Sequence, residues 1–456
     1  MRLIRALLRS LFFLLPVFLF SSNAPAQSFR AGAAKRDITP ADPIYLSGYA
    51  SRNKPSEGID QPIFARALAL EDSQGTKGIL VTIELVGITK DFTESIADRI
   101  KKELGVDREH FMIVASHTHN GPAVFGNLTA LLGLSGPDET VIKRHTEKMA
   151  AEVFDAASEA LRKLEPARLT FGHGKATFAT NRRVFTARGV EFGANSEGPV
   201  DHDVPVLRIE SPEGDLRAVV FGYACHGTTL RGDYYLLGGD WPGYAQKYLE
   251  LAYPGATALF VTGCAGDADP QPRGKIAQTR EHGLEMAGAV ASVFSHSMNA
   301  IGGPWRAAFE RVTLEQGTPP SQAEFQRRLQ DSDAFVQKHA RRNLERLNHG
   351  QELRRNYASP VQIWRFGDDL TLVALGGEVV VDYALRLKRE LGREKLWVAA
   401  YANDVFAYIP SNRILIEGGY EADFSMLYYD FPTRWAASIE DTLIKAVHDL
   451  VARTRQ

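Results

Sequence analysis

The sequence predicts an α/β fold in which mixed β-sheets are flanked by helices. Apolar runs rich in β-branched residues alternate along the chain with stretches of amphipathic helical spacing, and such alternation is typical of this fold class. The runs that resemble buried strands lie at residues 78–83, 110–115, 216–221 and 258–262. The 456 residues are 44% hydrophobic and 24% charged, which supports a large core and excludes a disordered or disulfide-stapled chain.

Between and after these runs, the spacing of apolar residues predicts the helices. Residues 91–104 and 138–164 repeat apolar side chains every three to four positions, and the first helix is expected to begin at Asp91, with Glu94 completing a capping box. A stretch at about 321–357 mixes acidic and basic residues, which predicts an exposed helical hairpin. Further strands are expected at 361–366, 370–375 and 396–402, and a last helix at about 435–451.

The first 26 residues have the pattern of a secretory signal peptide. Three arginines among the first nine residues precede an apolar run at 11–20, and small residues end the segment at Ala26. A spanning helix needs roughly 20 apolar residues, and Pro16 interrupts this shorter run, so an uncleaved anchor is the weaker interpretation. We therefore expect a secreted or periplasmic protein, cleaved near Ala26, whose mature chain is not stably inserted in a membrane.

Residues 27–456 show neither an internal repeat nor a linker composition, so a single domain is expected there. Lysine and arginine number 53 against 55 acidic residues, a net charge of -2, and this balance argues against nucleic acid as a partner. Cys225 and Cys264 are the two cysteines, and they fit either a disulfide or two buried thiols. The sequence does not indicate an oligomeric state.

Polar residues of ligand type follow four of the expected strands. His117 and His119 come directly after one apolar run, His226 follows another, Glu378 follows a third, and Tyr408 stands beyond a fourth. Ligands in α/β sheets bind outside the carboxyl ends of strands. Imidazole, carboxylate and phenol groups gathered there would suit zinc. The sequence therefore predicts, within this fold class, a metal site at the carboxyl ends of strands.

Each of these residues also has a structural interpretation. A single histidine at a strand end is more often a hydrogen-bonded structural residue than a ligand. Glu378 is also suited to the N-terminus of a following helix, where negative charge is favourable, and Tyr408 is also suited to the core. The segment 262–270, which carries Asp267 and Asp269, fits a carboxylate-bearing site or an ordinary tight turn.

Taken in order, several short motifs resemble the amino-terminal catalytic domain of the neutral ceramidase family. The resemblance extends over about residues 29–435, and Tyr408 and Tyr420 are twelve residues apart, as in the family. The motifs are Ala31-Gly-Ala-Ala-Lys-Arg-Asp-Ile-Thr-Pro, Leu46-Ser-Gly-Tyr-Ala, Phe64-Ala-Arg-Ala, His117-Thr-His-Asn-Gly-Pro, Asn181-Arg182, Ala224-Cys-His-Gly-Thr, Tyr408-Ile-Pro-Ser and Tyr420-Glu-Ala.

The resemblance implies roles for particular residues of this chain. It implies one zinc ion with the ligand set His117, His226, Glu378 and Tyr408. It also implies that His119 and Arg182 line the reaction centre, with Tyr420 nearby as a hydrogen-bond donor. Gly48 falls in the family's substrate-contacting glycine loop, and Asp267 is a second candidate for substrate binding.

Two departures from the family pattern bear on the substrate. Where the family has Gly-Asp-x-Ser-Pro, this chain has Asp269 in place of the serine. A carboxylate there suits a general base towards metal-activated water, or a ligand of a second divalent cation near Asp267 and Asp269. The chain also ends about twenty residues after Trp435, so no immunoglobulin-like domain is expected at the carboxyl end.

These observations support three functions. The first is a secreted zinc-dependent hydrolase that cleaves an N-acyl amide, ceramide-like, by metal-activated water, with Asp269, His119, Arg182 and Tyr420 as catalytic residues. The second is a metal-dependent hydrolase of an ester, lactone or phosphoester in a soluble substrate. The third is a non-catalytic zinc-binding periplasmic protein. The expected partner is a small-molecule or lipid substrate.

Overall fold

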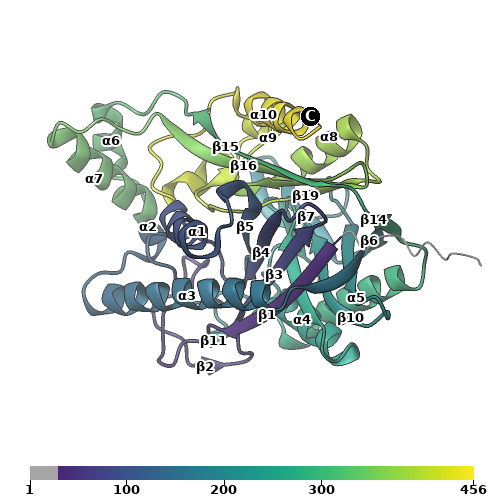
Figure 1. Cartoon of the computed structure of the whole chain (residues 1–456). Helices are drawn as coiled ribbons and strands as arrows, with labels where there is room; N and C mark the ends of the chain where they lie inside the picture. Colours follow the sequence, from purple (N-terminus) through teal and green to yellow (C-terminus); the bar gives the residue numbers. More distant parts are fainter. Residues whose placement is uncertain (1–28, 456) are drawn as a thin grey trace, which may run out of the picture.

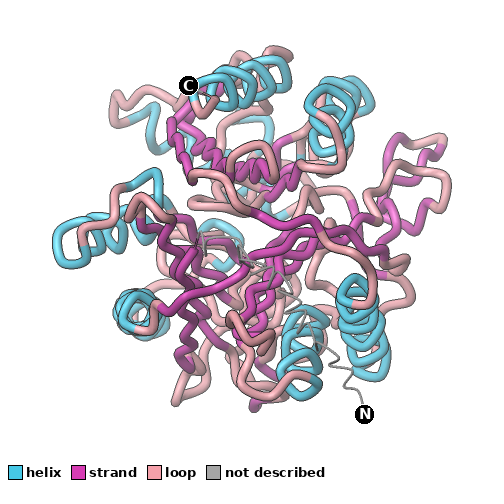
Figure 2. The backbone as a smooth tube through the Cα atoms, turned by 45° about the vertical axis from the view of Figure 1, so that its right-hand side comes forward, coloured by secondary structure: helices cyan, strands magenta, loops and turns pink. Residues whose placement is uncertain are grey.

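The computed structural model describes residues 29–455 and contains two main sheets (Figures 1 and 2). The larger has nine strands in the order β12-β10-β9-β6-β1-β3-β4-β5, with β14 also paired to β6. Its strands are β1 (Phe29–Asp37), β3 (Phe64–Asp72), β4 (Lys77–Ile83), β5 (Phe111–Ala115), β6 (Glu165–Lys175), β9 (Asp203–Glu210), β10 (Leu216–Tyr223), β12 (Thr257–Thr262) and β14 (Asn299–Ile301).

Each end of the large sheet is a parallel strand pair joined through a helix. The pairs β4–β5 and β10–β12 are parallel, while the other neighbours in this sheet run antiparallel. Parallel neighbours need a long crossover, and α1 (Lys90–Leu104) and α4 (Asp240–Ala252) provide it. α3 (Pro137–Arg162) packs on β1 and β3, and α5 (Ile276–Phe294) packs on α4 and β6. The predicted α/β class is thereby confirmed.

The two ends of the large sheet curl towards each other. The Thr262 hydroxyl at the end of β12 donates to the carbonyl of Ala115 at the end of β5 (2.8 Å). The segment 400–402 lies against both ends, because Ala400 N–H donates to Thr262 O and Ala115 N–H donates to Tyr401 O. The loops that leave β5 and β10 therefore meet, and Thr118 and Gly227 form a parallel bridge.

The second sheet packs over one face of the first. Its order is β15-β16-β17-β19, and Trp364 and Trp397 from it share an apolar cluster with strands of the large sheet. Helices α8 (Val381–Leu391) and α10 (Ile439–Arg453) pack on this second sheet, and Figure 1 shows them along the top of the molecule. Its strands are β15 (Trp305–Glu315), β16 (Asn356–Phe366), β17 (Leu370–Leu375) and β19 (Leu396–Ala399).

Smaller elements surround the loops at the strand ends. Strand β13 (Ala268–Pro270) pairs with the hairpin β7–β8, and β18 (Glu378–Val379) pairs in parallel with β20 (Tyr408–Ile409). In the charged stretch, α6 (Gln322–Arg328) and α7 (Ala334–Asn348) project on the left of Figure 1. The remaining elements are β2 (Gly58–Ile59), β7 (Ala179–Thr186), β8 (Gly189–Asn195), β11 (Leu236–Leu237), α2 (Thr129–Leu132), α9 (Asn412–Glu417) and the 3-10 turns Arg108–His110 and Phe424–Leu427.

Several predicted boundaries were wrong. The N-cap of α1 is Thr89, whose hydroxyl accepts the N–H of Phe92 (3.1 Å), so Asp91 lies in the first turn and is not the cap. Glu94 forms no capping box, because its carboxylate pairs with Arg108 and an arginine of β15. The last helix begins at Ile439 rather than near 435, and β19 ends at Ala399 rather than at 402.

The expected signal peptide lies outside the described residues. Within residues 29–455, no helix has the length and apolar character needed to cross a membrane. Both cysteines are buried free thiols, so the question left open by the sequence is answered in favour of thiols. Burial raises the pKa of both thiols, so they are not reactive nucleophiles at neutral pH.

Candidate metal centre

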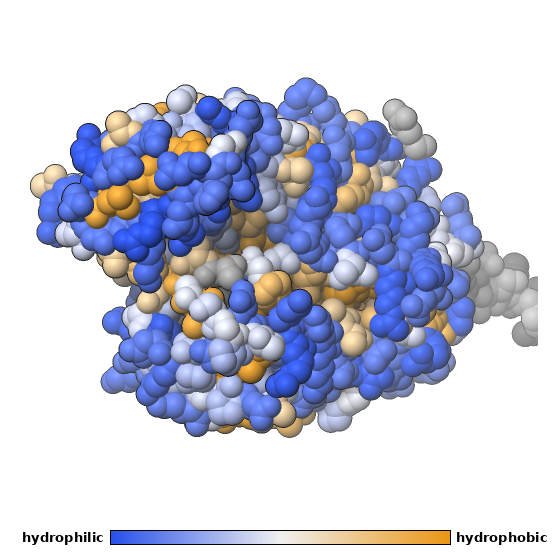
Figure 3. Space-filling model, turned by 90° about the vertical axis from the view of Figure 1, so that its left-hand side faces the viewer, coloured by the Kyte–Doolittle hydropathy of each residue, from blue (hydrophilic) through white to orange (hydrophobic). Residues whose placement is uncertain are grey.

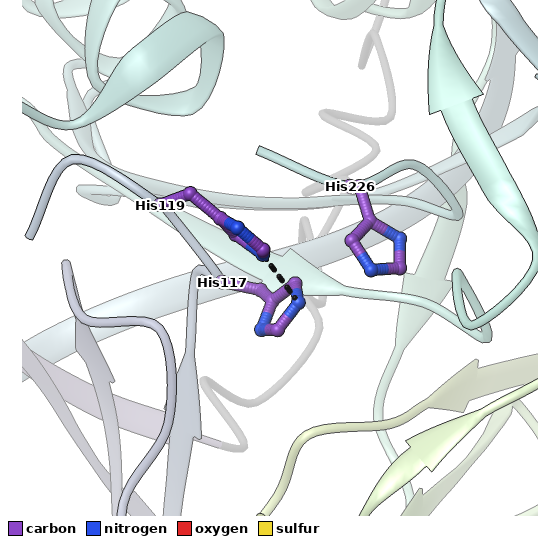
Figure 4. A group of neighbouring side chains, drawn as sticks. All are labelled: His117, His119 and His226. Atoms are coloured by element: carbon purple, nitrogen blue, oxygen red, sulfur yellow. Dashed lines mark hydrogen bonds between the residues drawn. The ribbon is translucent and has the colours of Figure 1, made fainter. Parts of the chain in front are cut away.

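Three side chains from separate strand ends converge at the centre of the molecule. His117 follows β5, His226 follows β10, and Glu378 lies in β18. Oε2 of Glu378 is 3.0 Å from Nε2 of His117 and 3.3 Å from Nε2 of His226. All three residues are at most 3% exposed. Figure 4 shows His117 and His226 facing one another from two different segments.

The outer nitrogens of both imidazoles fix the tautomer. Nδ1 of His117 lies 2.5 Å from the carbonyl of Val86, and Nδ1 of His226 lies 2.7 Å from the carbonyl of Ala265. A carbonyl oxygen only accepts, so each Nδ1 carries the proton and each Nε2 presents a lone pair. Burial, with nearby Arg182, lowers the pKa of His226 to about 4, which keeps that ring neutral.

Two lone pairs and a carboxylate oxygen therefore face one another in a buried space. Oε2 of Glu378 has no hydrogen-bond partner among the described residues, although its other oxygen accepts the hydroxyl of Tyr429 (2.5 Å). A buried acceptor without a donor is costly, and a cation between Oε2 of Glu378 and the two imidazole nitrogens would satisfy it. Histidine metal ligands usually donate their other ring N–H to a carbonyl or carboxylate, as His117 and His226 do. These residues thus fit a metal ion.

Tyr408 and His119 complete the surroundings of this space. Tyr408 is the register partner of Glu378 in the β18–β20 ladder, and its hydroxyl lies 3.2 Å from Nε2 of His226. Nε2 of His119 lies 3.1 Å from Nε2 of His117, and ligand atoms of the three histidines fall within 4.8 Å of one another. Burial, together with the neighbouring histidines, holds the pKa of His119 well below its usual value, so its ring is neutral.

Unusual backbone conformations hold these side chains in place. His117 has φ 57° and Tyr401, whose ring packs 4.5 Å from that of His117, has φ 55°. Non-glycine residues in this region carry strain that surrounding structure must hold. Gly48, at φ 99°, lies directly under His119, since a Cβ there would be 2.4 Å from Nδ1 of that ring.

Arg182, on β7, points its guanidinium into the same space. It donates to the Tyr408 hydroxyl (3.1 Å), and Nη1 lies 3.2 Å from Nε2 of His226. On its other side it pairs with Glu421 (2.9 Å) and Asp269 (3.3 Å). Burial by itself would lower the pKa of Arg182, but Tyr408 and the two carboxylates outweigh it and raise that pKa well above its usual value. The group is permanently charged.

Asp269 lies behind Arg182 and is held by several donors. It pairs with Arg182 and Arg273 and accepts the hydroxyl of Thr228 (3.2 Å). Burial would raise the pKa of this carboxyl, but the two arginines outweigh it and lower the pKa to about 2. A carboxylate with so low a pKa is a weak base at neutral pH. The geometry therefore favours a role for Asp269 in holding Arg182 over the predicted role of base.

Both carboxylate oxygens of Asp267 accept hydrogen bonds from protein groups. One carboxylate oxygen accepts the N–H of Val381 at the start of α8 (2.8 Å), and the other accepts the side-chain amide of Asn181 (3.0 Å). The residue is 0% exposed. These contacts favour a structural role over the predicted contact with substrate. Asp267 and Asp269 are thus both bonded to protein donors, and the group of three or more metal-ligating side chains found among the described residues is His117, His119 and His226.

A cavity of about 540 Å³ opens beside Arg182, and we call it the Arg182 cavity. Its lining includes Arg182, Val190, Phe192, Tyr420, Phe424 and Tyr428. The Tyr420 ring lies 5.2 Å from that of Tyr408, so Tyr420 stands between the cavity and the centre.

Sequence reasoning did not find three residues of this region. Tyr429 donates to Glu378, Glu421 orients Arg182, and Arg273 pairs with Asp269. Glu421 belongs to the Tyr420-Glu-Ala motif, so the family resemblance could have indicated it. Tyr429 and Arg273 carry no local signal, because only the fold brings them to their partners.

The fold and the buried cluster define an α/β protein with a candidate metal centre at its strand ends. A family described as neutral/alkaline non-lysosomal ceramidase, N-terminal, matches residues 29–314. The match covers more than half of the chain, which therefore belongs to this family.

Curated relatives of similar sequence are neutral ceramidases. The neutral ceramidase of Pseudomonas aeruginosa is 26% identical over 271 residues, 56% of this chain and 40% of that protein. Neutral ceramidase A of Dictyostelium discoideum is 25% identical over 263 residues, 54% of this chain and 36% of that protein. The matched part of this chain thus spans well under half the length of these relatives.

Solved structures share the fold. A structure described as ceramidase complexed with C2 superimposes with a TM-score of 0.73 at 19% identity, covering 94% of this chain and 75% of that one. The crystal structure of neutral ceramidase from Pseudomonas aeruginosa gives a TM-score of 0.72, also at 19% identity, and covers 94% of this chain and 74% of that one.

Gly48→Ala should displace the His119 ring, because the new Cβ would clash with Nδ1. Gly75→Ala is the matched control: Gly75 also has positive φ, at 83°, but nothing lies within 4 Å of a Cβ there. Both variants should lose roughly 1–3 kcal/mol of stability from backbone strain. Only Gly48→Ala should shift the imidazole NMR resonances of His119, and unchanged resonances in that variant would contradict the packing described.

Asp269→Asn should destabilise the protein in a pH-dependent way. The folded pKa of about 2 lies below the ordinary 3.8, so the carboxylate contributes about 2 kcal/mol above pH ~4, lost as the pH falls through ~2. Urea unfolding at several pH values measures the difference from the unmodified chain. Asp203→Asn is a positive control for the pH dependence, because His173 and Lys388 lower the pKa of Asp203 to the same value of about 2. A destabilisation by Asp269→Asn that does not shrink between pH 4 and 2 would contradict the ion pairs.

Proposed function

We propose that this protein is a secreted, zinc-dependent hydrolase that cleaves the amide bond of a ceramide-like N-acyl compound. The observation that carries the proposal is the convergence of His117, His226 and Glu378 beside the permanently charged Arg182. The named relatives are neutral ceramidases, which supports an amide of a lipid as substrate. The signal-peptide pattern of the first 26 residues supports export.

The candidate zinc ligands are His117, His226, Glu378 and Tyr408. Two neutral imidazoles with oxygen donors match the ligand types of catalytic zinc sites. When bound, zinc supplies a Lewis acid that polarises a carbonyl and activates water. No cysteine is needed, because two imidazoles, one carboxylate and one phenol already fill a four-coordinate set.

Residues of this chain then have separate roles in amide hydrolysis. Arg182 stabilises the negative charge that develops on the carbonyl oxygen as water adds to the carbonyl carbon. The His119 ring, whose Nε2 lies 3.1 Å from Nε2 of His117, is placed to accept the proton that water loses and to return it to the amine nitrogen as the C–N bond breaks. Tyr420 offers a hydroxyl donor from the Arg182 cavity. Asp269 and Glu421 fix the orientation of Arg182.

Asp269 also supports a second candidate, hydrolysis of an ester, lactone or phosphoester in a soluble substrate. Where the family pattern has a serine, this chain has a carboxylate paired with Arg182 and Arg273. No hydroxyl nucleophile stands at that position, so water must attack directly. Two arginines near the centre also suit a substrate that carries negative charge.

The test is turnover of a panel of N-acyl amides, esters and phosphoesters by the zinc-loaded protein. We expect amide hydrolysis that a chelator abolishes and zinc restores. Glu378→Ala should lose bound zinc, whereas His119→Ala should keep about one zinc per chain and lose roughly 100-fold or more in kcat. His448→Ala is the control, because His448 is a surface residue paired with Glu390. Stoichiometric zinc with no amide cleaved would contradict the amidase, and turnover of esters alone would favour the second candidate.

A further inference from the structure

Three side chains at the candidate metal centre come from one segment of the chain, residues 420–431. They are Tyr420, Glu421 and Tyr429. The regular secondary structure of this segment is one 3-10 turn at 424–427. A segment without a longer helix or a strand of its own depends for its shape on the elements that pack against it.

Helix α7 of the charged stretch is one of these elements. Figure 3 views the molecule from the side on which α6 and α7 project in Figure 1, and most of the surface there is hydrophilic. On the inner face of α7, in contrast, His339, Ala340, Asn343 and Leu344 are buried. Nε2 of His339 lies 2.8 Å from the carbonyl of Phe431, at the end of the segment. Helix α7 is therefore in contact with the segment as well as with solvent.

Asp430 of this segment pairs with two arginines of α7. Nε of Arg342 donates to one carboxylate oxygen (2.9 Å), and Nη2 of Arg346 donates to the other. Arg342 and Arg346 are four residues apart on the helix, where like charges repel each other, and the shared carboxylate offsets that repulsion. Burial by itself would raise the pKa of Asp430, but the two arginines outweigh it and lower that pKa below its ordinary value. The carboxylate is therefore charged at neutral pH.

Asp430 also has an unusual backbone conformation, with φ at 59°. Aspartate tolerates the left-handed region better than most residues, but such a conformation persists only where the surrounding structure holds it. The ion pairs with α7 hold it here. The neighbouring residues also contact α7, because the carbonyl of Phe431 is bonded to it and the Tyr428 ring packs 5.0 Å from that of Phe335. Tyr429 thus lies between residues that α7 contacts on either side.

The position of Tyr429 matters because its hydroxyl determines which oxygen of Glu378 faces the imidazoles. The hydroxyl donates to Oε1 (2.5 Å), which leaves Oε2 at 3.0 Å from Nε2 of His117 and 3.3 Å from Nε2 of His226. The last torsion of a glutamate is broad, so the carboxylate would rotate more freely without this bond. Loss of a group that orients a metal ligand typically costs roughly 10- to 100-fold in metal affinity.

We propose that Arg342 and Arg346 are positioning residues for the candidate metal centre. Through Asp430 they hold Tyr429 in the place from which its hydroxyl orients Glu378. This inference rests on the proposed zinc site and adds an element that sets the affinity of that site, the α7 helix of the charged stretch.

A double-mutant cycle tests the proposal. The zinc dissociation constant is measured by competition with a chromophoric chelator for Arg342→Ala/Arg346→Ala, for Tyr429→Phe and for the combination of all three substitutions. Arg341→Ala is the matched control, because Arg341 is the preceding residue of α7 and is exposed. Asp430→Asn reaches the same ion pairs from the other side, since it removes the charge and keeps a side chain that tolerates positive φ.

We expect Arg342→Ala/Arg346→Ala, Asp430→Asn and Tyr429→Phe each to weaken zinc binding by roughly tenfold or more, with Arg341→Ala unchanged. Because Tyr429 transmits the effect, the arginine substitutions should weaken binding no further in the Tyr429→Phe background. Unchanged zinc affinity in Asp430→Asn or in the arginine variant would overturn the proposal. Effects that add fully to that of Tyr429→Phe would also overturn it, because the arginines would then act by another route.

A second measurement does not depend on zinc. In protein whose tyrosines are isotope-labelled at Cζ, the NMR resonance that Tyr429→Phe removes belongs to Tyr429. In the zinc-free protein this resonance should shift in Arg342→Ala/Arg346→Ala and stay in place in Arg341→Ala, and a resonance that does not move in the arginine variant would contradict the positioning role. If it shifts as expected while the unmodified chain binds no zinc or cleaves no amide, the proposed function is wrong and the positioning of Tyr429 stands.

Discussion

The lone pairs of His117 and His226 and the carboxylate of Glu378 face one another in one buried space, and the surrounding structure holds them there. Each imidazole is oriented by a backbone carbonyl at its outer nitrogen. That orientation is possible only because the ends of the large sheet curl together, so that the loops after β5 and β10 pair with each other. Oε2 of Glu378 is a buried acceptor without a donor among the described residues, and a cation shared with the two imidazole nitrogens is the simplest group that satisfies it.

Each charged side chain around this centre is paired with a neighbour of opposite charge. Arg182 lies beside the histidines, and behind it Asp269 and Glu421 compensate its charge. Asp269 is in turn paired with Arg273. Because every member is buried or nearly so, removal of one leaves an uncompensated charge in a low-dielectric interior. The buried carboxylate of Asp269 is therefore accommodated by the arginines on either side of it, and it acts on the centre through Arg182.

Much of the fold was predictable from sequence, since buried strands and amphipathic helices have local periodicities. Helix starts were less so: Asp91 and Thr89 are both suitable caps, and only the backbone geometry selects Thr89. The histidines and Glu378 were found because they follow apolar runs directly. Arg182, in contrast, came only from the family resemblance, and its partners are distant in sequence.

Contacts that depend on tertiary structure were beyond the sequence. Nothing near Tyr429 in the chain indicates that it reaches Glu378, 51 positions earlier. Asp267 and Asp269 look equivalent in sequence, yet one caps α8 and the other pairs with two arginines. The pairing of β13 with β7 decides which face of this short strand each side chain occupies. No local sequence pattern indicates that pairing.

The most direct measurement of the central claim is X-ray absorption spectroscopy of the zinc-loaded protein at the metal edge. We expect a shell of nitrogen and oxygen atoms with scattering from two imidazole rings, those of His117 and His226. Sulfur in that shell, from Cys225 beside His226, would contradict it. So would three imidazoles, which would make His119 a ligand in place of an oxygen donor.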